Sequence, residues 1–526
     1  MSRTKKLARN GVFGALSYVV VVAISFALRK YFVDCFGYDL VGLNGVLTAI
    51  IGTLSIAELG IGLTIAYSLY KPVAENDTKK ITALIRLYKK IYAVIAVIVL
   101  VIGLAVMPFL SFIVNGVSGG ADTETNRHVF QFTEILFPYL IFLSGSVASY
   151  FFSFNHCLLT VDQKNYVISV VNALVRIITG GLQLLIVFIL QDFLLYIAAG
   201  VALSFIGNIF LSFYVRRAYP YLKNAADKLA PDEMKTLKSK IGAMLYHRIG
   251  NYFVNGVDAI LISIFISVTV VGYFNNYLLI STTIVLLVTS LFSGLTASFG
   301  DILATDGAKA AKRAFRNAQF SFFILYTVVV SGIFSTVTVF MKLWLTEETV
   351  LPMVFLIPWC VNIFMAGYSE PLGSLRLSAG LLEQDKYVHI ALPFINLAVS
   401  IALVQFMGIG GIMLGTTFCL LIKEIWVLPR IVYKHIFKES SRAYYLRMLL
   451  RFSFAVCVAA GCYAVNLLID TGSYLWDFLI GGVAGVTISG AAILLLFGRS
   501  DEMKYLFSTA KSLLKRKKEH PNSLNE

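Results

Sequence analysis

The stretch IYAVIAVIVLVIGLAVMPFLSFIV, residues 91–114, decides the fold class because it contains no charged side chain. About 20 apolar residues in a helix are enough to cross the ~30 Å hydrocarbon core of a bilayer. The remainder of the chain has the same character, with 58% hydrophobic and 14% charged residues and a mean hydropathy of +0.80. A soluble domain cannot bury so much apolar surface, and we therefore expect an all-α polytopic membrane protein.

About fourteen stretches of this kind are long enough to span a membrane. They lie near residues 11–31, 40–66, 91–114, 130–156, 166–190, 193–215, 241–266, 270–299, 317–343, 350–375, 387–407, 409–433, 447–469 and 475–497. The apolar run that ends at Leu28 resembles a signal peptide but lacks a convincing cleavage site, so we interpret it as an uncleaved first span.

The net charge of +15 is explained by the side of the membrane on which the basic residues lie. Most Lys and Arg residues fall in the N-terminal tail, in the loops after even-numbered spans and in the C-terminal tail. Only four fall on the opposite side, namely Arg29, Lys30, Arg127 and Lys342. The positive-inside rule then places both termini in the cytoplasm, and no nucleic-acid partner is needed to account for the charge.

Faint internal repeats divide the chain into similar halves. Val41-Gly42 in the second span matches Val271-Gly272 in the eighth, and the loops after the fourth and tenth spans contain QKNYV (163–167) and QDKYV (384–388). Transporters often contain such duplications. The predicted domains are an N-terminal six-helix bundle (1–216), a cytoplasmic linker (217–240), a C-terminal six-helix bundle (241–434), two additional helices (435–498) and a basic cytoplasmic tail (499–526).

Several spans collect polar residues on one helical face, and these faces contain the candidate functional residues. In the fifth span the face contains Asn172, Arg176 and Gln183, and in the seventh it contains Arg248, Asn251, Asn255 and Asp258; Glu58 lies on a polar face of the second span. A charge at the centre of a span costs about 2.5–3.5 kcal/mol on insertion scales, so such a residue should face the bundle interior or a water-filled cavity.

Small and polar faces also hold membrane helices together, and this simpler interpretation suits most of the Ser, Thr and Gly positions. It suits Arg176 and Arg248 less well, because a guanidinium is an expensive packing element and a good phosphate ligand. Asp258 and Glu58 fit either neutralisation of an arginine or ion coupling. Metal-ligand clusters, nucleophile motifs and phosphate-binding loops are missing from the sequence, so we expect no enzyme, no metal and no cofactor beyond a coupling proton or sodium ion.

Four parts of the chain resemble the Wzx-type O-antigen and polysaccharide flippases. The matching stretches are LSIAELGIG (54–62), YSLYKP (67–72) and ND (76–77) around the second span, GNY (250–252), Asp258, VGY (271–273) and NY (276–277) in the seventh and eighth, and DQK (162–164) after the fourth. The resemblance extends from about Leu7 to Lys434. It implies the fold of the multidrug/oligosaccharidyl-lipid/polysaccharide (MOP) exporter superfamily, with two six-helix bundles in a V around a central cavity and two C-terminal helices.

The family's function implies a substrate and a location. Wzx-type flippases turn an undecaprenyl-diphosphate-linked oligosaccharide from the inner to the outer leaflet of the bacterial cell membrane, for polysaccharide biosynthesis. We expect alternating access, membrane lipid around the chain, and a polysaccharide polymerase and glycosyltransferases as partners. The site hypothesis assigns Arg176 and Arg248 to the diphosphate, and Asn172, Gln183, Asn251 and Asn255 to sugar hydroxyls.

Two alternatives remain open at this point, and the first of them belongs to the same superfamily. An ion-coupled exporter of small cationic drugs would favour an acidic cavity and usually twelve spans. A non-catalytic subunit of a polysaccharide export complex would have no use for buried arginines. A membrane-embedded polymerase or ligase is disfavoured because the longest outward loop, roughly Asn115 to His128, is too short for a catalytic domain.

Overall fold

The computed structural model describes residues 3–508 and 511, apart from 56–60, 117–128, 155, 224–230, 232–233, 235–255, 293 and 382. Every regular element in these residues is a helix, so the all-α prediction is confirmed. The chain divides into two compact units. The first contains Met1–Leu278 with His389–Pro393, and the second contains Leu279–Val388 with Phe394–Glu526. The domain boundaries given by the sequence stay a prediction.

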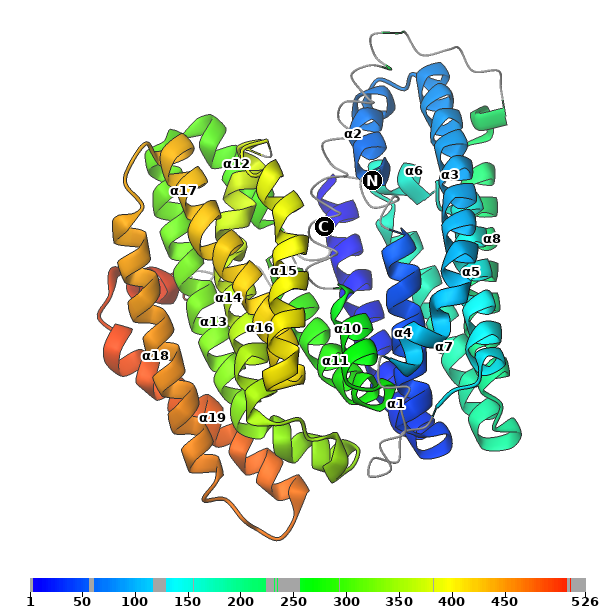
Figure 1. The fold of residues 1–526 in the computed structure, drawn as a ribbon. Coiled ribbons are helices and arrows are strands. Elements are labelled where there is room, and N and C mark those ends of the chain that lie inside the picture. Colours follow the sequence, from blue (N-terminus) through cyan, green and yellow to red (C-terminus); the bar gives the residue numbers. More distant parts are fainter. Residues whose placement is uncertain are drawn as a thin grey trace. The chain divides into compact units, whose positions relative to one another are not determined.

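The first unit is built around helices from the N-terminal half of the chain (Figure 1). Its elements are α1 (Arg3–Leu54), α2 (Ile61–Ala74), α3 (Thr78–Val106), η2 (Met107–Phe109), α4 (Leu110–Asn115), α5 (Phe132–Ser153), α6 (His156–Val161), α7 (Asn165–Leu185), η3 (Ile186–Leu190), α8 (Phe193–Ala218), η4 (Pro220–Lys223), α10 (Asp258–Phe265) and the first part of α11 (Val268–Leu291). Helix α7 packs between α1 and α8, and α5 packs against α3 and α8.

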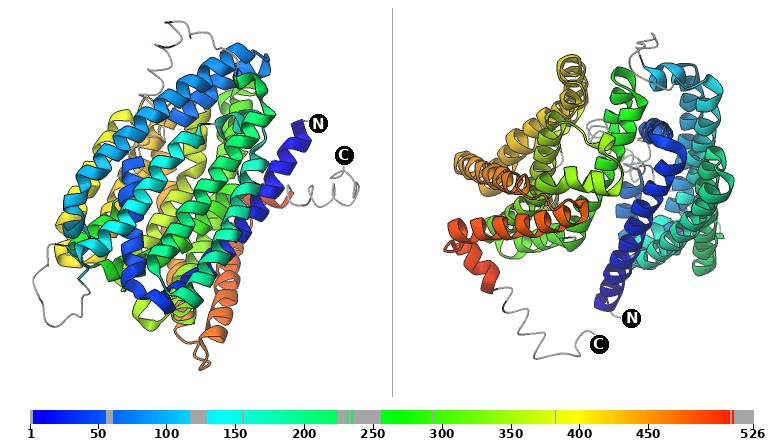
Figure 2. Two further views of the ribbon diagram at one scale, coloured as in Figure 1. Left: turned by 90° about the vertical axis from the view of Figure 1, so that its right-hand side faces the viewer. Right: turned by 90° about the horizontal axis from the view of Figure 1, so that it is seen from below.

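The second unit is organised around the long helix α13 (Gly307–Trp344), which contacts α14 (Met353–Ser378), α18 (Arg442–Asn466) and α19 (Tyr474–Phe497). Figure 2 shows α18 and α19 as neighbours in both views. The other elements are α12 (Leu295–Thr305), η5 (Glu347–Thr349), α15 (Lys386–Met407), α16 (Ile409–Leu420), η6 (Leu421–Val427), α17 (Leu428–Val432), η7 (Tyr433–Phe437) and a short helix at 501–508.

Twelve helices in the described residues are long and apolar enough to cross a membrane. Two features of the structure account for the difference between these twelve helices and the predicted total of about fourteen spans. Most of the predicted span 241–266 lies outside the described residues. The first two predicted spans lie on either side of Gly37 (φ 76°, ψ 174°), the non-helical residue at which two helices meet inside the element α1, so α1 counts as one candidate span. The first predicted span ends a few residues short of this break, and Arg29 therefore lies inside a helix and not in an outer loop.

The repeated glycines Gly42 and Gly272 meet where α1 crosses α11, inside the first unit. A Cβ atom added to Gly42 would lie 1.8 Å from the carbonyl oxygen of Val268, and one added to Gly272 would lie 2.4 Å from that of Tyr38. Each glycine thus faces the carbonyl four residues before the other. Thr269 Oγ1 donates a 2.5 Å hydrogen bond to Asp39 at the same crossing. Only glycine permits so close a backbone approach.

Replacement of Gly272 by leucine is expected to destabilise the protein by about 1–3 kcal/mol, because the side chain would force two helix backbones apart. Gly181→Leu is a matched control, since a Cβ at Gly181 meets nothing within 4 Å. Thermal unfolding of the purified protein in detergent measures both changes. Equal midpoints for the two variants would show that the crossing is not tightly packed.

The two repeated QKNYV-type loops are each fixed by a carboxylate next to the glutamine. In the first unit, Asp162 pairs with Lys164 Nζ at 2.7 Å and accepts a 2.6 Å hydrogen bond from the Tyr219 hydroxyl. Burial and this hydrogen bond to Asp162 raise the pKa of Tyr219. In the second unit, Asp385 is 3% exposed and pairs with Arg376. Corresponding loops of the two halves therefore use the same kind of anchor with different partners.

Candidate functional site: two arginines in the first unit

Arg176 lies on α7 with its guanidinium turned toward α1. Its Nη2 donates a 3.0 Å hydrogen bond to Ser25 Oγ, and the Ser25 hydroxyl in turn donates to the carbonyl of Val21 at 2.8 Å. The side chain is half-buried, and its Nε is buried without a hydrogen-bond partner among the described residues. A guanidinium has five donors, so most of the binding capacity of Arg176 is left over after the contact with Ser25.

A second arginine, Arg29, shares this environment. It lies four residues after Ser25 on α1 and therefore on the same helical face. It is half-buried and lies close enough to Arg176 and to the Tyr196 hydroxyl of α8 to interact with both electrostatically. Within the described part of the chain, no carboxylate forms an ion pair with either arginine. Two positive charges thus lie close together, and no carboxylate of the described residues pairs with them.

Close helix packing holds this pair in place. Gly180, one turn after Arg176, approaches α1 so closely that an added Cβ would lie 2.6 Å from Ile24 Cγ2. On the next turn, Gln183 is 7% exposed and its Nε2 donates a 3.1 Å hydrogen bond to the carbonyl of Tyr196. The polar face predicted for the fifth span therefore runs along the contacts of α7 with α1 and α8.

The other predicted site residues are distributed as follows. Asn172 is exposed, one turn before Arg176 on α7. Asp258 is 4% exposed and lies in the first turn of α10. Arg248, Asn251, Asn255 and Glu58 lie outside the described residues. The structure thus brings together Arg176 and Gln183 on neighbouring turns of α7, and the ligand and coupling roles of all eight residues stay predictions.

Sequence reasoning missed Arg29 as a site residue because it placed the end of the first span there. Its spacing of four from Ser25 was a usable signal, since it sets two polar side chains on one face of an apolar helix. The helix break at Gly37, eight residues later, was the information needed to keep Arg29 inside the span.

The first unit also contains a cavity of about 480 Å³ with a different lining. Its walls are mainly aromatic and apolar, with Phe36, Phe137 and Phe193 among them, and two carboxylates, Asp39 and Glu134, face it. Both carboxylates have partners, because Asp39 accepts from Thr269 and Glu134 accepts from the backbone N–H of Gln131 at 2.8 Å. Acidic and aromatic groups together favour organic cations.

Comparisons with known proteins support the fold and leave the family open. No family model and no curated protein matches the sequence. Among solved structures, the lipid II flippase MurJ in an inward closed conformation is similar over 93% of this chain and 98% of its own, with a TM-score of 0.64 and 12% identity.

Two transporters of the multidrug resistance (MATE) family are similar too. An inward-facing MATE transporter of the MOP superfamily covers 80% of this chain and 98% of its own, with a TM-score of 0.58 and 11% identity. A point mutant of the MATE transporter VcmN, from Vibrio cholerae, covers 83% and 97%, with a TM-score of 0.58 and 13% identity. The chain is therefore a multi-pass membrane protein with the fold of MOP superfamily transporters.

Proposed function

We propose that this chain is a flippase for an anionic, lipid-linked oligosaccharide, with a polyprenyl diphosphate as the carrier. The observation that supports the proposal is the pair Arg29 and Arg176, half-buried in adjacent membrane helices without a carboxylate partner among the described residues. Each such charge costs about 2.5–3.5 kcal/mol to place in a span, and two like charges side by side cost more. An anionic ligand offsets this cost.

The chemistry of a diphosphate matches the arginine pair. Guanidinium groups donate parallel hydrogen bonds to phosphate oxygens, and each such charge-assisted bond is stronger than a neutral one. Asn172, one turn from Arg176, would donate and accept hydrogen bonds at sugar hydroxyls, as would Asn251 and Asn255. Arg248 would add a further cation. Gln183 would meet sugar hydroxyls too, while its hydrogen bond to the Tyr196 carbonyl holds it against α8.

The proposed transport cycle lowers the free energy needed to move this head group through the hydrocarbon core of the bilayer. A diphosphate sugar has a charge and many hydroxyls, and its transfer into hydrocarbon costs many kcal/mol. A wet, cationic path between the helices lowers that barrier while the polyprenyl tail stays in lipid. Alternating access would then turn the head group to the outer leaflet, with Asp258 and Glu58 as candidates for proton or sodium coupling. A lipid II flippase among the structural neighbours is in keeping with this chemistry.

Export of a small organic cation is the second candidate function. It is favoured by the acidic and aromatic cavity at Asp39 and Glu134, and by the multidrug transporters among the structural neighbours. The two candidates require opposite charges on the substrate, which makes them separable by experiment.

The purified chain should be reconstituted into liposomes with a fluorescent polyprenyl-diphosphate oligosaccharide, and the label that reaches the opposite leaflet should be scored. We expect transfer of this lipid, and no transfer of the same oligosaccharide on an uncharged polyprenyl carrier, because only the diphosphate offers the arginines an anion. Efflux of a cationic dye driven by an ion gradient, without lipid transfer, would favour the second candidate and refute the first.

A further inference from the structure

A second cationic site lies in the other unit, at the N-terminal end of α13. A cavity of about 760 Å³ is bounded by α13 on one side and by the helix 501–508 on the other. Its lining contains five basic side chains and two acidic ones. The basic ones are Lys309, Lys312, Arg313 and Arg316 of α13, and Lys504 of the short helix.

The four basic residues of α13 follow the spacing of one helical face. Positions 309, 312, 313 and 316 are separated by three and four residues, which places their side chains next to one another. The opposite face contains Ala311 and Phe315, which are fully buried in the unit. The cationic face is therefore fixed by the packing of α13 and cannot rotate away from the cavity.

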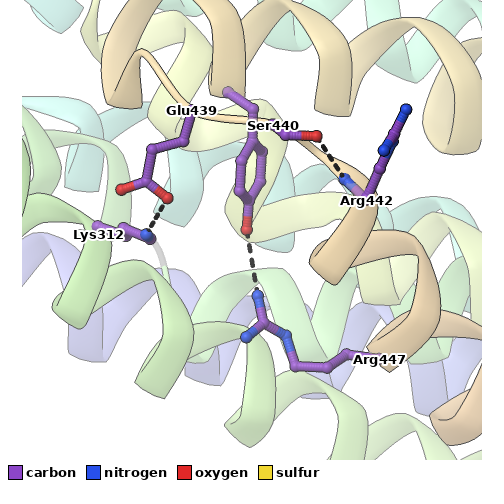
Figure 3. A network of polar contacts seen from close by, with 6 residues as sticks. Lys312, Glu439, Ser440, Arg442 and Arg447 are labelled. Carbon is purple, nitrogen blue, oxygen red and sulfur yellow. Dashed lines mark hydrogen bonds and ion pairs between the residues drawn. The ribbon is translucent and has the colours of Figure 1, made fainter.

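Two of these four cations are neutralised by protein carboxylates. Lys312 pairs with Glu439, in the turn between η7 and α18 (Figure 3). Arg316 Nη2 donates a 2.7 Å hydrogen bond to Glu502 Oε1. Burial is the largest influence on Glu502 and opposes its ionisation, but the hydrogen bonds to this carboxyl and the positive charges of Arg316 and Arg451 together outweigh burial and lower the pKa. The pair is thus ionised at neutral pH.

Lys309 and Arg313 have no ion-pair or hydrogen-bond partner among the described residues, and both are exposed to the cavity. Lys504 pairs with Asp501, at 3.6 Å and on the surface, where such a pair contributes little. Tyr505 and Ser508 add hydroxyl groups to the same wall. The cavity therefore offers two free cations and several hydrogen-bond donors, which together are the chemistry of a phosphate site.

The short helix 501–508, which follows α19, is packed against the second unit. Its Met503 is 5% exposed, its Glu502 side chain is held by Arg316, and the backbone N–H of Met503 donates to Ser500 Oγ at 3.2 Å. Because of these contacts the helix forms a wall of the cavity. A merely solvated basic face of α13 would need no such wall.

We propose that this cavity binds a phosphate-bearing anion, and that its natural source is the head group of an anionic phospholipid. The sequence places this end of α13 on the cytoplasmic side, where basic pockets beside membrane helices meet anionic lipid head groups. A free phosphate compound has the same binding chemistry and is the other possible source. The proposal does not depend on the identity of the transported substrate.

The test compares binding by the full chain and by the variant Lys309→Gln/Arg313→Gln in nanodiscs, with a fluorescent phosphatidylglycerol in a phosphatidylcholine background. Each basic residue near a membrane surface contributes about 1 kcal/mol, so loss of both should weaken binding roughly 30-fold. Lys89→Gln/Lys90→Gln is the matched control, since it removes two exposed charges from α3. Equal loss in both double variants would overturn the proposal.

Two further measurements are needed. One tests whether binding depends on the shape of the cavity or only on the positive charge of the surface, and the other identifies the source of the phosphate. Met503→Asn changes no charge but removes the anchor of the short helix. It should weaken lipid binding several-fold, whereas unchanged binding would overturn the role of the cavity. The second measurement uses inorganic phosphate as a soluble probe of the same cavity. Saturable phosphate binding in detergent that Lys309→Gln/Arg313→Gln abolishes, without any lipid preference, would support the site and assign it to a soluble anion.

Discussion

Under the proposed function, the double variant Arg29→Gln/Arg176→Gln is expected to transfer the labelled polyprenyl-diphosphate oligosaccharide at least about 100-fold more slowly than the natural chain, and to be no less stable. Each charged hydrogen bond to the substrate is worth about 1.5–3 kcal/mol, and two of them account for this factor or more. Stability should be preserved, because removal of two adjacent half-buried positive charges relieves a cost that outweighs the lost bond to Ser25.

Liposome transfer of the labelled lipid gives the rate, and the unfolding midpoint in detergent gives the stability. Lys30→Gln is the matched control, since it removes an exposed positive charge next to Arg29. Arg29→Lys/Arg176→Lys keeps both charges but loses the planar donor arrangement, so an intermediate rate is expected. Unimpaired transfer by the glutamine variant would rule out the arginine pair as the head-group site.

Asp385→Ala is expected to destabilise the second unit by about 3–5 kcal/mol, because it leaves the Arg376 guanidinium buried without its counter-charge. The equivalent change in the first unit, Asp162→Ala, should cost about 1 kcal/mol, since its ion pair with Lys164 is partly exposed. Denaturant or thermal unfolding in detergent measures both costs and their ratio.

A compensating variant separates loss of the ion pair from loss of the loop itself. In Arg376→Met/Asp385→Leu neither partner is left charged, and replacement of a buried pair by apolar groups is often close to neutral. This variant should therefore recover most of the stability that Asp385→Ala loses. If the double variant instead loses as much stability as the sum of the two single changes, the loop does not depend on the pairing of these charges.

Hydrophobic length predicted the fold class and the place of most spans, because a bilayer demands an uninterrupted apolar helix wherever the chain crosses. It ended the first span a few residues short, because the helix that contains Arg29 continues to Gly37, where the second helix begins. A local apolar average ends a span at its last apolar run and cannot detect a helix that continues past charged residues such as Arg29 and Lys30. The misplaced end hid Arg29 from the search for charges inside spans.

Helical periodicity found Arg176 and Gln183 on one face but could not say what that face meets. Gln183 bonds to the Tyr196 carbonyl and Arg176 to Ser25, and both contacts depend on which helices become neighbours. The cavity between α13 and the helix 501–508 was invisible for the same reason. Its two walls lie far apart in sequence, and contacts such as the pair of Arg316 with Glu502 show that they meet.

The reciprocal crossing of Gly42 and Gly272 also has a practical use. Main-chain atoms in direct contact have no rotamers to exchange, so the two helices cannot slide past each other in small steps as side-chain interfaces do. The crossing therefore acts as a fixed internal standard. Probes attached to α1 and to the first part of α11 on either side of it are expected to report a constant separation, against which displacements elsewhere in the first unit can be calibrated.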